Sequence, residues 1–146
     1  MRRLLAANVI LAVLLGLHVA DHGLRQHAGP TGVAAGPALL DAIAILGSLV
    51  LTARHSSHAP LVALVVGAGT ALGFAAVHMT PHWSAFSDSY FDRPVDALSW
   101  ANMLTNVAAA VLLALAAVQA RAAAAARPAT LPEKMQPPRK VPSSAR

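Results

Sequence analysis

The sequence of 146 residues contains no cysteine, few charged residues and few aromatic residues. Without cysteine the chain has no disulfide, no thiolate metal site and no cysteine nucleophile, and its redox compartment stays unconstrained. Charged residues make up only 12% of the chain and aromatic residues 4%, whereas hydrophobic residues reach 56%. A composition this apolar and this poor in charge is not typical of a soluble domain.

Acidic residues are scarcer than basic ones, which gives a formal net charge of +5. The basic residues concentrate at the two termini and form no patch interleaved with aromatic side chains, so no nucleic-acid partner is expected. The length fits a single domain. Abundant alanine and little lysine are typical of a GC-rich genome, and we expect a small bacterial membrane protein.

Four apolar runs are separated by more polar loops, at roughly 4–20, 38–53, 60–79 and 97–118. A helix needs about 20 mainly apolar residues to cross a bilayer. Backbone polar groups in lipid must be satisfied within the segment, and no alternation of period two points to a barrel. We therefore predict an all-α membrane protein, a four-helix transmembrane bundle over residues 1–126 in the lipid bilayer, with helices at about 3–22, 35–54, 59–80 and 95–120.

The basic residues beside these runs predict the orientation in the cell membrane. Two arginines precede the first run, Arg54 lies between the second and third, and six basic residues follow the fourth. The other two loops contain one arginine each. By the positive-inside rule both termini lie in the cytoplasm, and the loops 21–37 and 80–96 face outward. The basic, Pro-rich segment 127–146 should be a disordered cytoplasmic tail.

Small and polar residues predict how the helices pack. Gly69 and Gly73 have the small-xxx-small spacing that lets two membrane helices approach closely. In the fourth run Ser99, Asn102 and Asn106 share one helical face, which should point into the bundle and hydrogen-bond across helices. Such faces are most often packing contacts within one bundle. They can also bind a partner membrane protein or a second copy of the chain.

Histidines gather toward the side of the bundle that is predicted to face outward. His18, Asp21 and His22 lie at positions i, i+3 and i+4, on one face at the end of the first helix. His78 and His82 are again four residues apart, at the end of the third run. Because the first and third helices run in the same direction, these two sets should reach the same membrane depth.

Imidazole and carboxylate groups from two helices are the ligand types of a transition-metal site. We therefore predict such a site at the outer mouth, with Asp88, Asp92 and Asp96 of the following loop available as further ligands. The candidate ligands on the helices are His18, Asp21, His22, His78 and His82. Nitrogen and oxygen ligands favour Zn²⁺ or Fe²⁺, Met79 is a weaker argument for copper, and the low aromatic content disfavours haem.

Pro81 is the main difficulty for this site. Proline ends or kinks a helix, so His78 and His82 need not share a face. Thr80 and Pro81 can instead begin a short interfacial helix at His82. The histidines also have an alternative role as interfacial residues, with the ring body in lipid and the polar tip in water. A Ser-His-Asp arrangement with Ser84, Ser87 or Ser89 is a weaker alternative, since triads depend on geometry rather than sequence proximity.

Two functional hypotheses follow from these patterns, and neither names a substrate or a reaction. In the first, the protein binds a transition metal at the outer mouth of the bundle. In the second, it is a non-catalytic accessory or assembly subunit of a larger membrane complex. The small size and the expected lack of a spacious cavity favour the second hypothesis, whereas the shared depth of the histidines favours the first.

Overall fold

The computed structural model describes residues 1–26 and 32–126, and this part of the chain contains helices and no strand. The predicted tail, 127–146, lies outside the described residues. The all-helical architecture is confirmed, and the helix ends differ from the expected ones by a few residues. The helices are α1 (Arg2–Ala20), which continues as the π-helical turn η1 (Asp21–Arg25), α2 (Gly32–Ala53), α3 (Ala59–His78) and α4 (Ala97–Ala125).

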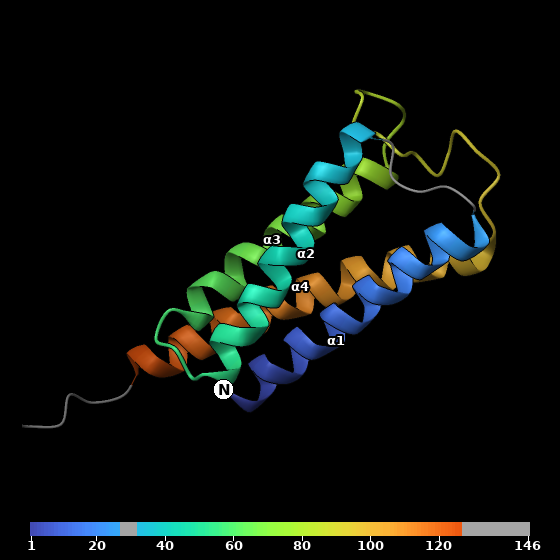
Figure 1. The fold of residues 1–146 in the computed structure, drawn as a ribbon. Helices are drawn as coiled ribbons and strands as arrows, with labels where there is room; N and C mark the ends of the chain where they lie inside the picture. The colour runs from blue at the N-terminus through green and yellow to red at the C-terminus, as the bar shows by residue number, and fades with distance from the viewer. Residues whose placement is uncertain (27–31, 127–146) are drawn as a thin grey trace, which may run out of the picture.

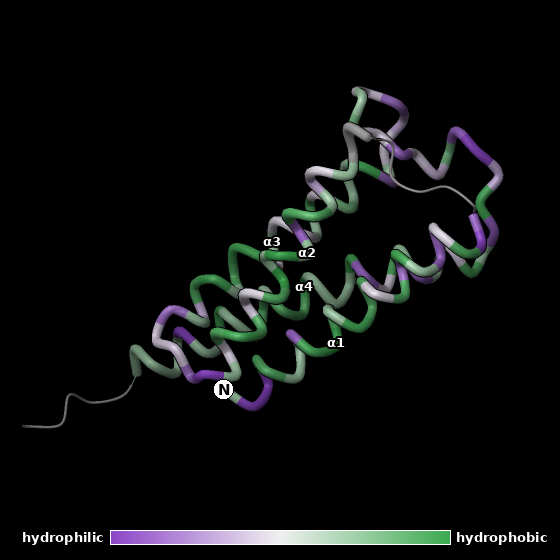
Figure 2. Tube along the Cα trace, in the orientation of Figure 1, coloured by the Kyte–Doolittle hydropathy of each residue, from purple (hydrophilic) through white to green (hydrophobic). Residues whose placement is uncertain are grey.

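The distribution of side chains is that of a multi-pass membrane protein. Each of the four long helices is long and apolar enough to cross a membrane. Large apolar side chains such as Val13, Leu72 and Leu112 are exposed, while Asn8 and Asn106 are fully buried. A soluble protein has the opposite distribution. Figure 2 shows the strongly hydrophilic segments mainly at the two ends of the bundle.

Helix α4 is the element that holds the bundle together. It packs along α3 and along α1, whereas α1 and α3 make little direct contact and α2 packs on α1 and α3. Figure 1 shows the N-terminus, the turn between α2 and α3 and the end of α4 at one end, called here the turn end. The opposite end, the loop end, contains residues 79–96 (Figure 1). The C-terminal ends of α1 and α3 both lie at the loop end.

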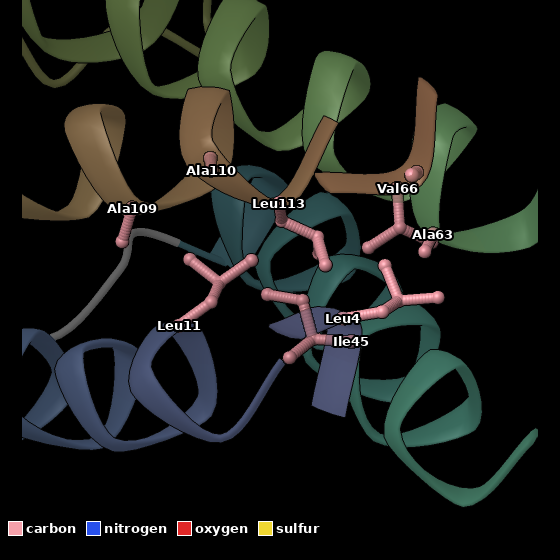
Figure 3. Close-up of a cluster of buried hydrophobic side chains, with 9 residues drawn as sticks. Leu4, Leu11, Ile45, Ala63, Val66, Ala109, Ala110 and Leu113 are labelled. Atoms are coloured by element: carbon pink, nitrogen blue, oxygen red, sulfur yellow. The ribbon is translucent and has the colours of Figure 1, made fainter. Parts of the chain in front are cut away.

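The apolar core lies in the half of the bundle near the turn end. All four long helices contribute to it, and Figure 3 shows Leu4 and Leu11 of α1 facing Ile45 and Leu113. Small residues of α3 and α4 complete the cluster, so these two helices lie close together. The core consists of Leu4, Leu11, Ile45, Ala63, Val66, Ala109, Ala110, Leu113 and Ala117.

Helices α3 and α4 approach each other closely at Gly67. A Cβ atom at this position would lie 2.7 Å from the Ala110 carbonyl oxygen and 2.7 Å from the Ala114 backbone nitrogen. Gly69 and Gly73, the pair with the predicted small-xxx-small spacing, have no such neighbour within 4 Å. The expectation that this pair forms the helix contact is therefore wrong, because both glycines lie on a different face of α3.

Buried polar side chains join helices across the bundle. Asn8 of α1 donates to Thr52 Oγ1 (3.2 Å) and accepts from Ser48 Oγ (2.7 Å), which links α1 to α2. On α4, Asn106 Nδ2 donates to the Leu14 carbonyl of α1 (3.1 Å). The predicted inward direction of the polar face of α4 is confirmed for Asn106 and for Ser99, which are both buried.

Replacing Gly67 by alanine should destabilise the bundle by about 1–3 kcal/mol, because the new methyl group overpacks against the α4 backbone. The matched control is Gly69→Ala, where the added methyl has open space and alanine favours the helix. Thermal unfolding of both variants in detergent, followed by circular dichroism, measures the difference. Equal unfolding temperatures for the two variants would contradict the close approach at Gly67.

Candidate metal centre

The loop after α3 folds back on the end of that helix and thereby builds one wall of the site. The last carbonyl groups of a helix lack partners within the helix. Here the Asp88 N–H donates to the Val77 carbonyl and the Tyr90 N–H donates to the His78 carbonyl, both at 3.0 Å. The Trp83 indole N–H donates to the Ala76 carbonyl (2.8 Å). These hydrogen bonds hold residues 88–90 directly against the end of α3.

Three buried histidines meet at the loop end, and together they can hold a metal ion. His18 and His22 come from α1 and η1, and His78 is the last residue of α3. Their exposed fractions are only 6%, 9% and 7%. One ring nitrogen from each lies within 4.8 Å of the other two. The predicted meeting of the α1 and α3 histidines is thus confirmed for three of the four residues.

Hydrogen bonding fixes the tautomer of His78. Its Nδ1 lies 3.0 Å from the backbone carbonyl oxygen of Asp88. A carbonyl oxygen only accepts, so Nδ1 carries the proton and donates it. The lone pair of the neutral ring is then on Nε2. A backbone carbonyl that orients a histidine in this way is a common support of metal ligands.

The carboxylate of Asp88 lies beside the three rings. Its Oδ2 is 3.8 Å from His22 Nε2 and 3.6 Å from His78 Nδ1. The same oxygen accepts a hydrogen bond from Arg93 Nη2 at 2.9 Å. Among the predicted loop carboxylates, Asp88 is therefore the one that the fold brings to the histidines. Arg93 supplies the positive charge that balances it.

A second hydrogen-bonded chain reaches His22 from the outside of the site. Gln26 Nε2 lies 3.2 Å from the Tyr90 hydroxyl oxygen and donates to it. The hydroxyl oxygen lies 3.1 Å from His22 Nε2. Burial raises the pKa of Tyr90 above its ordinary value, so the hydroxyl keeps its proton and forms a hydrogen bond with the ring nitrogen. Tyr90 thus holds the orientation of the His22 ring.

His18 carries the clearest sign of an unmet interaction. Its Nδ1 is buried and has no hydrogen-bond partner among the described residues. The ring packs against Phe74, with centroids 4.8 Å apart, and against His22, with centroids 4.5 Å apart. A buried polar atom without a partner costs about 1–3 kcal/mol. The site therefore retains a polar nitrogen where an apolar side chain would be more stable.

The remaining predicted ligands lie elsewhere. Asp21 is buried, but its carboxylate accepts from Gln26 (2.7 Å) and pairs with Arg25 (3.3 Å). Asp96 is the N-cap of α4: the Ser99 N–H donates to its carboxylate at 2.9 Å and holds the pKa of Asp96 below its ordinary value. The carboxylate of Asp96 also pairs with Arg25.

His82 and Asp92 are exposed residues of the loop and do not belong to the group of close ligand atoms. Helix α3 ends at His78, three residues before Pro81, so the i, i+4 geometry of His78 and His82 does not form. The alternative short helix at His82 is also not formed, since residues 79–96 contain no helix. Met79 is exposed, which removes the argument for a soft copper ligand.

The serines near His82 have a structural role in the loop. Ser87 Oγ accepts hydrogen bonds from the backbone N–H groups of Trp83 (3.0 Å) and Ser84 (3.2 Å). Ser84 Oγ in turn accepts from the Phe86 N–H (3.1 Å). These contacts explain the serines without a Ser-His-Asp arrangement.

A cavity of about 630 Å³ opens beside the three histidines. It is lined by α1, α2, α3 and the loop, with Leu15, Leu40, Phe74 and Val77 among its apolar residues. The expectation that the chain lacks a spacious cavity is therefore wrong. The cavity forms because Gly69 and Gly73 line it and leave it unfilled.

The contacts of Gln26 and Tyr90 join residues far apart in the chain, so no sequence pattern indicated that these two would support the site. Arg93 is five residues from its partner Asp88, and this contact depends on the path of the loop. Asp41 is different. It lies inside an apolar run, and an ionisable residue in a membrane segment is itself a functional signal. It lines the same cavity as the histidines.

No family model matches this chain, and neither the curated proteins nor the solved structures contain a match to it.

Replacing His18 by phenylalanine should raise the stability of chelator-treated protein by about 1 kcal/mol, because it removes the buried nitrogen without a partner. Thermal unfolding in detergent with a chelator present measures this. His82→Phe changes an exposed residue in the same way and should leave the stability unchanged. A clear loss of stability in His18→Phe would mean that Nδ1 has a stabilising partner in the protein.

Proposed function

We propose that the protein binds a divalent transition metal ion at the outer mouth of its membrane bundle, through one ring nitrogen each of His18, His22 and His78. The observation that carries the proposal is the burial of three histidines whose ligand atoms lie within 4.8 Å of one another. Polar groups buried without partners cost free energy, and ionisable residues near a membrane interior are typically functional. Nδ1 of His18 is buried without a hydrogen-bond partner among the described residues, and a metal ion would supply one.

The spacing of the rings is compatible with a single ion after a small adjustment. Tetrahedral zinc with bonds of about 2.0–2.1 Å separates its ligand atoms by about 3.3 Å. The histidine nitrogens lie within 4.8 Å, so they need to move together by roughly 1–1.5 Å. Side-chain rotation of His18 and His22, which stand one helical turn apart, supplies a movement of this size.

Asp88 is a support of the metal site in this proposal. Its Oδ2 lies 3.8 Å from His22 Nε2 and 3.6 Å from His78 Nδ1. These ring nitrogens already hydrogen-bond to Tyr90 and to the Asp88 carbonyl, so the ion would bind the opposite ring nitrogens. The negative charge of Asp88 beside the rings would stabilise a bound cation. Three imidazole ligands with water in the fourth position are compatible with Zn²⁺ or Fe²⁺.

Purified wild-type protein should bind about one Zn²⁺ or Fe²⁺ per chain, as expected for a single four-ligand site. His22→Ala and His78→Ala should each lower the affinity about 100-fold or more, because removing a ligand costs more than removing an outer support, which costs 10–100-fold. Asp88→Asn should lower it about tenfold or more. Elemental analysis and metal titration of detergent-purified protein measure both stoichiometry and affinity.

His82→Ala is the matched control, since it removes an imidazole from the same loop without touching the three buried rings. Its metal content should equal that of the wild type. Metal absent from supplemented wild-type protein, or retained in both His22→Ala and His78→Ala, would exclude the site. The accessory-subunit hypothesis would then account better for the buried polar faces.

The orientation proposed for the bundle has both termini in the cytoplasm and the loop 79–96 outside the cell membrane. It is supported by the basic residues near the turn end, Arg2, Arg3 and Arg54, and in the tail. In this orientation the histidine site takes its metal from outside the cell.

Single cysteines test the orientation cleanly, because the natural chain contains none. Asp92→Cys, in the exposed part of the loop, should react with a membrane-impermeant maleimide in intact cells. Ser57→Cys, exposed in the turn between α2 and α3, should react only after the cells are permeabilised. Labelling of Ser57→Cys in intact cells, with Asp92→Cys protected, would reverse the orientation.

A further inference from the structure

Asp41 is a carboxylate inside a membrane-spanning helix, and the metal site does not use it. It is a half-buried residue of α2 that lines the cavity beside the histidines. Thr70 of α3 donates a hydrogen bond to its Oδ1 at 2.6 Å. Thr70 lies eight residues before His78 on α3, which places this pair about 12 Å deeper along the helix axis at 1.5 Å per residue.

The charge of Asp41 is not balanced by the residues that the structure describes. Asp88, the other carboxylate of the cavity, pairs with Arg93 at 2.9 Å. No lysine, arginine or histidine nitrogen among residues 1–26 and 32–126 lies within 4.0 Å of the Asp41 carboxylate. Its Oδ2 is buried and lacks a hydrogen-bond partner within the same ranges. A carboxylate in an apolar medium is stable as an anion only with a cation beside it.

The size and the apolar walls of the cavity indicate whether its cation is a metal ion or an organic molecule. A volume of about 630 Å³ lies in the usual range of small-molecule sites, roughly 300–1,000 Å³. Leu15, Leu40, Phe74 and Val77 make its wall mostly apolar. At the depth of Asp41 a hydrated metal ion would find one carboxylate and one hydroxyl, too few oxygen ligands for a hard cation. A single positive charge on an apolar body matches both the wall and the one carboxylate at this depth.

We propose that this cavity binds an apolar organic monocation, an ammonium group on a hydrophobic body, with Asp41 and Thr70 receiving the ammonium group. Rotation about the last side-chain bond of Asp41 exchanges its two oxygens, so either one can face the ligand. The ammonium donates to the carboxylate in a charge-assisted hydrogen bond. The apolar body lies against Phe74 and the aliphatic side chains. The site is separate in depth from the histidines and does not need a bound metal.

The test compares two probes of the same shape, 2-(2-naphthyl)ethylamine, which is an ammonium ion at neutral pH, and the uncharged 2-(2-naphthyl)ethanol. Binding to protein in nanodiscs is measured by equilibrium dialysis against empty nanodiscs, with a chelator present. Wild-type protein should prefer the ammonium by about tenfold, the size of one charge-assisted hydrogen bond. Asp41→Asn, which keeps the shape and the Thr70 contact, should bind both probes equally.

The alcohol reports the cavity itself, so unchanged alcohol binding in Asp41→Asn shows that the variant is folded. Asp92→Asn, an exposed carboxylate in the loop, is the matched control and should keep the preference. The chelator removes bound metal, so a preference measured in its presence belongs to this site and not to the metal site. The proposal would be overturned if wild-type protein showed no preference for the ammonium probe, or if Asp41→Asn kept that preference. Either result would mean that the Asp41 carboxylate does not bind the ammonium group.

Discussion

The close approach of α3 and α4 at Gly67 is the contact on which the rest of the structure depends. Lipid offers no hydrophobic drive for two helices to associate, so association relies on close packing and on hydrogen bonds. With no side chain at Gly67, the α3 backbone can lie against Ala110 and Ala114. Helix α4 also binds α1, through Asn106 and the apolar core. It therefore sets the relative position of α1 and α3, which touch each other little.

The meeting of the histidines is a consequence of that arrangement. His18 and His22 come from one helix and His78 from another, and both helices end at the loop end. The loop then completes the site, because its N–H groups satisfy the open carbonyls of α3 and hold Asp88 and Tyr90 in place. One set of backbone hydrogen bonds thus caps the helix and positions two side chains that contact the histidines.

One cavity with mostly apolar walls contains two kinds of polar group at different depths. The histidines with Asp88 are at the loop end, and Asp41 with Thr70 lies deeper. Below them the core of Leu11, Ile45 and their neighbours fills the bundle toward the turn end. The cavity therefore lies in the half of the bundle that contains the histidines. Both proposed ligands would enter through the same region and meet different groups.

The sequence by itself determined the helices, because runs of about 20 apolar residues in lipid have to satisfy their own backbone hydrogen bonds. Helical spacing also placed His18 and His22 on one face, and parallel direction placed His78 at the same depth. Only the tertiary structure decided that α3 ends at His78, that His82 is exposed and that Asp88 is the carboxylate at the site. The contacts of Gly67, Tyr90 and Asp41 depend on the rotation of the helices and on the path of the loop. Side-chain packing determines both, and the spacing of residues along the sequence does not.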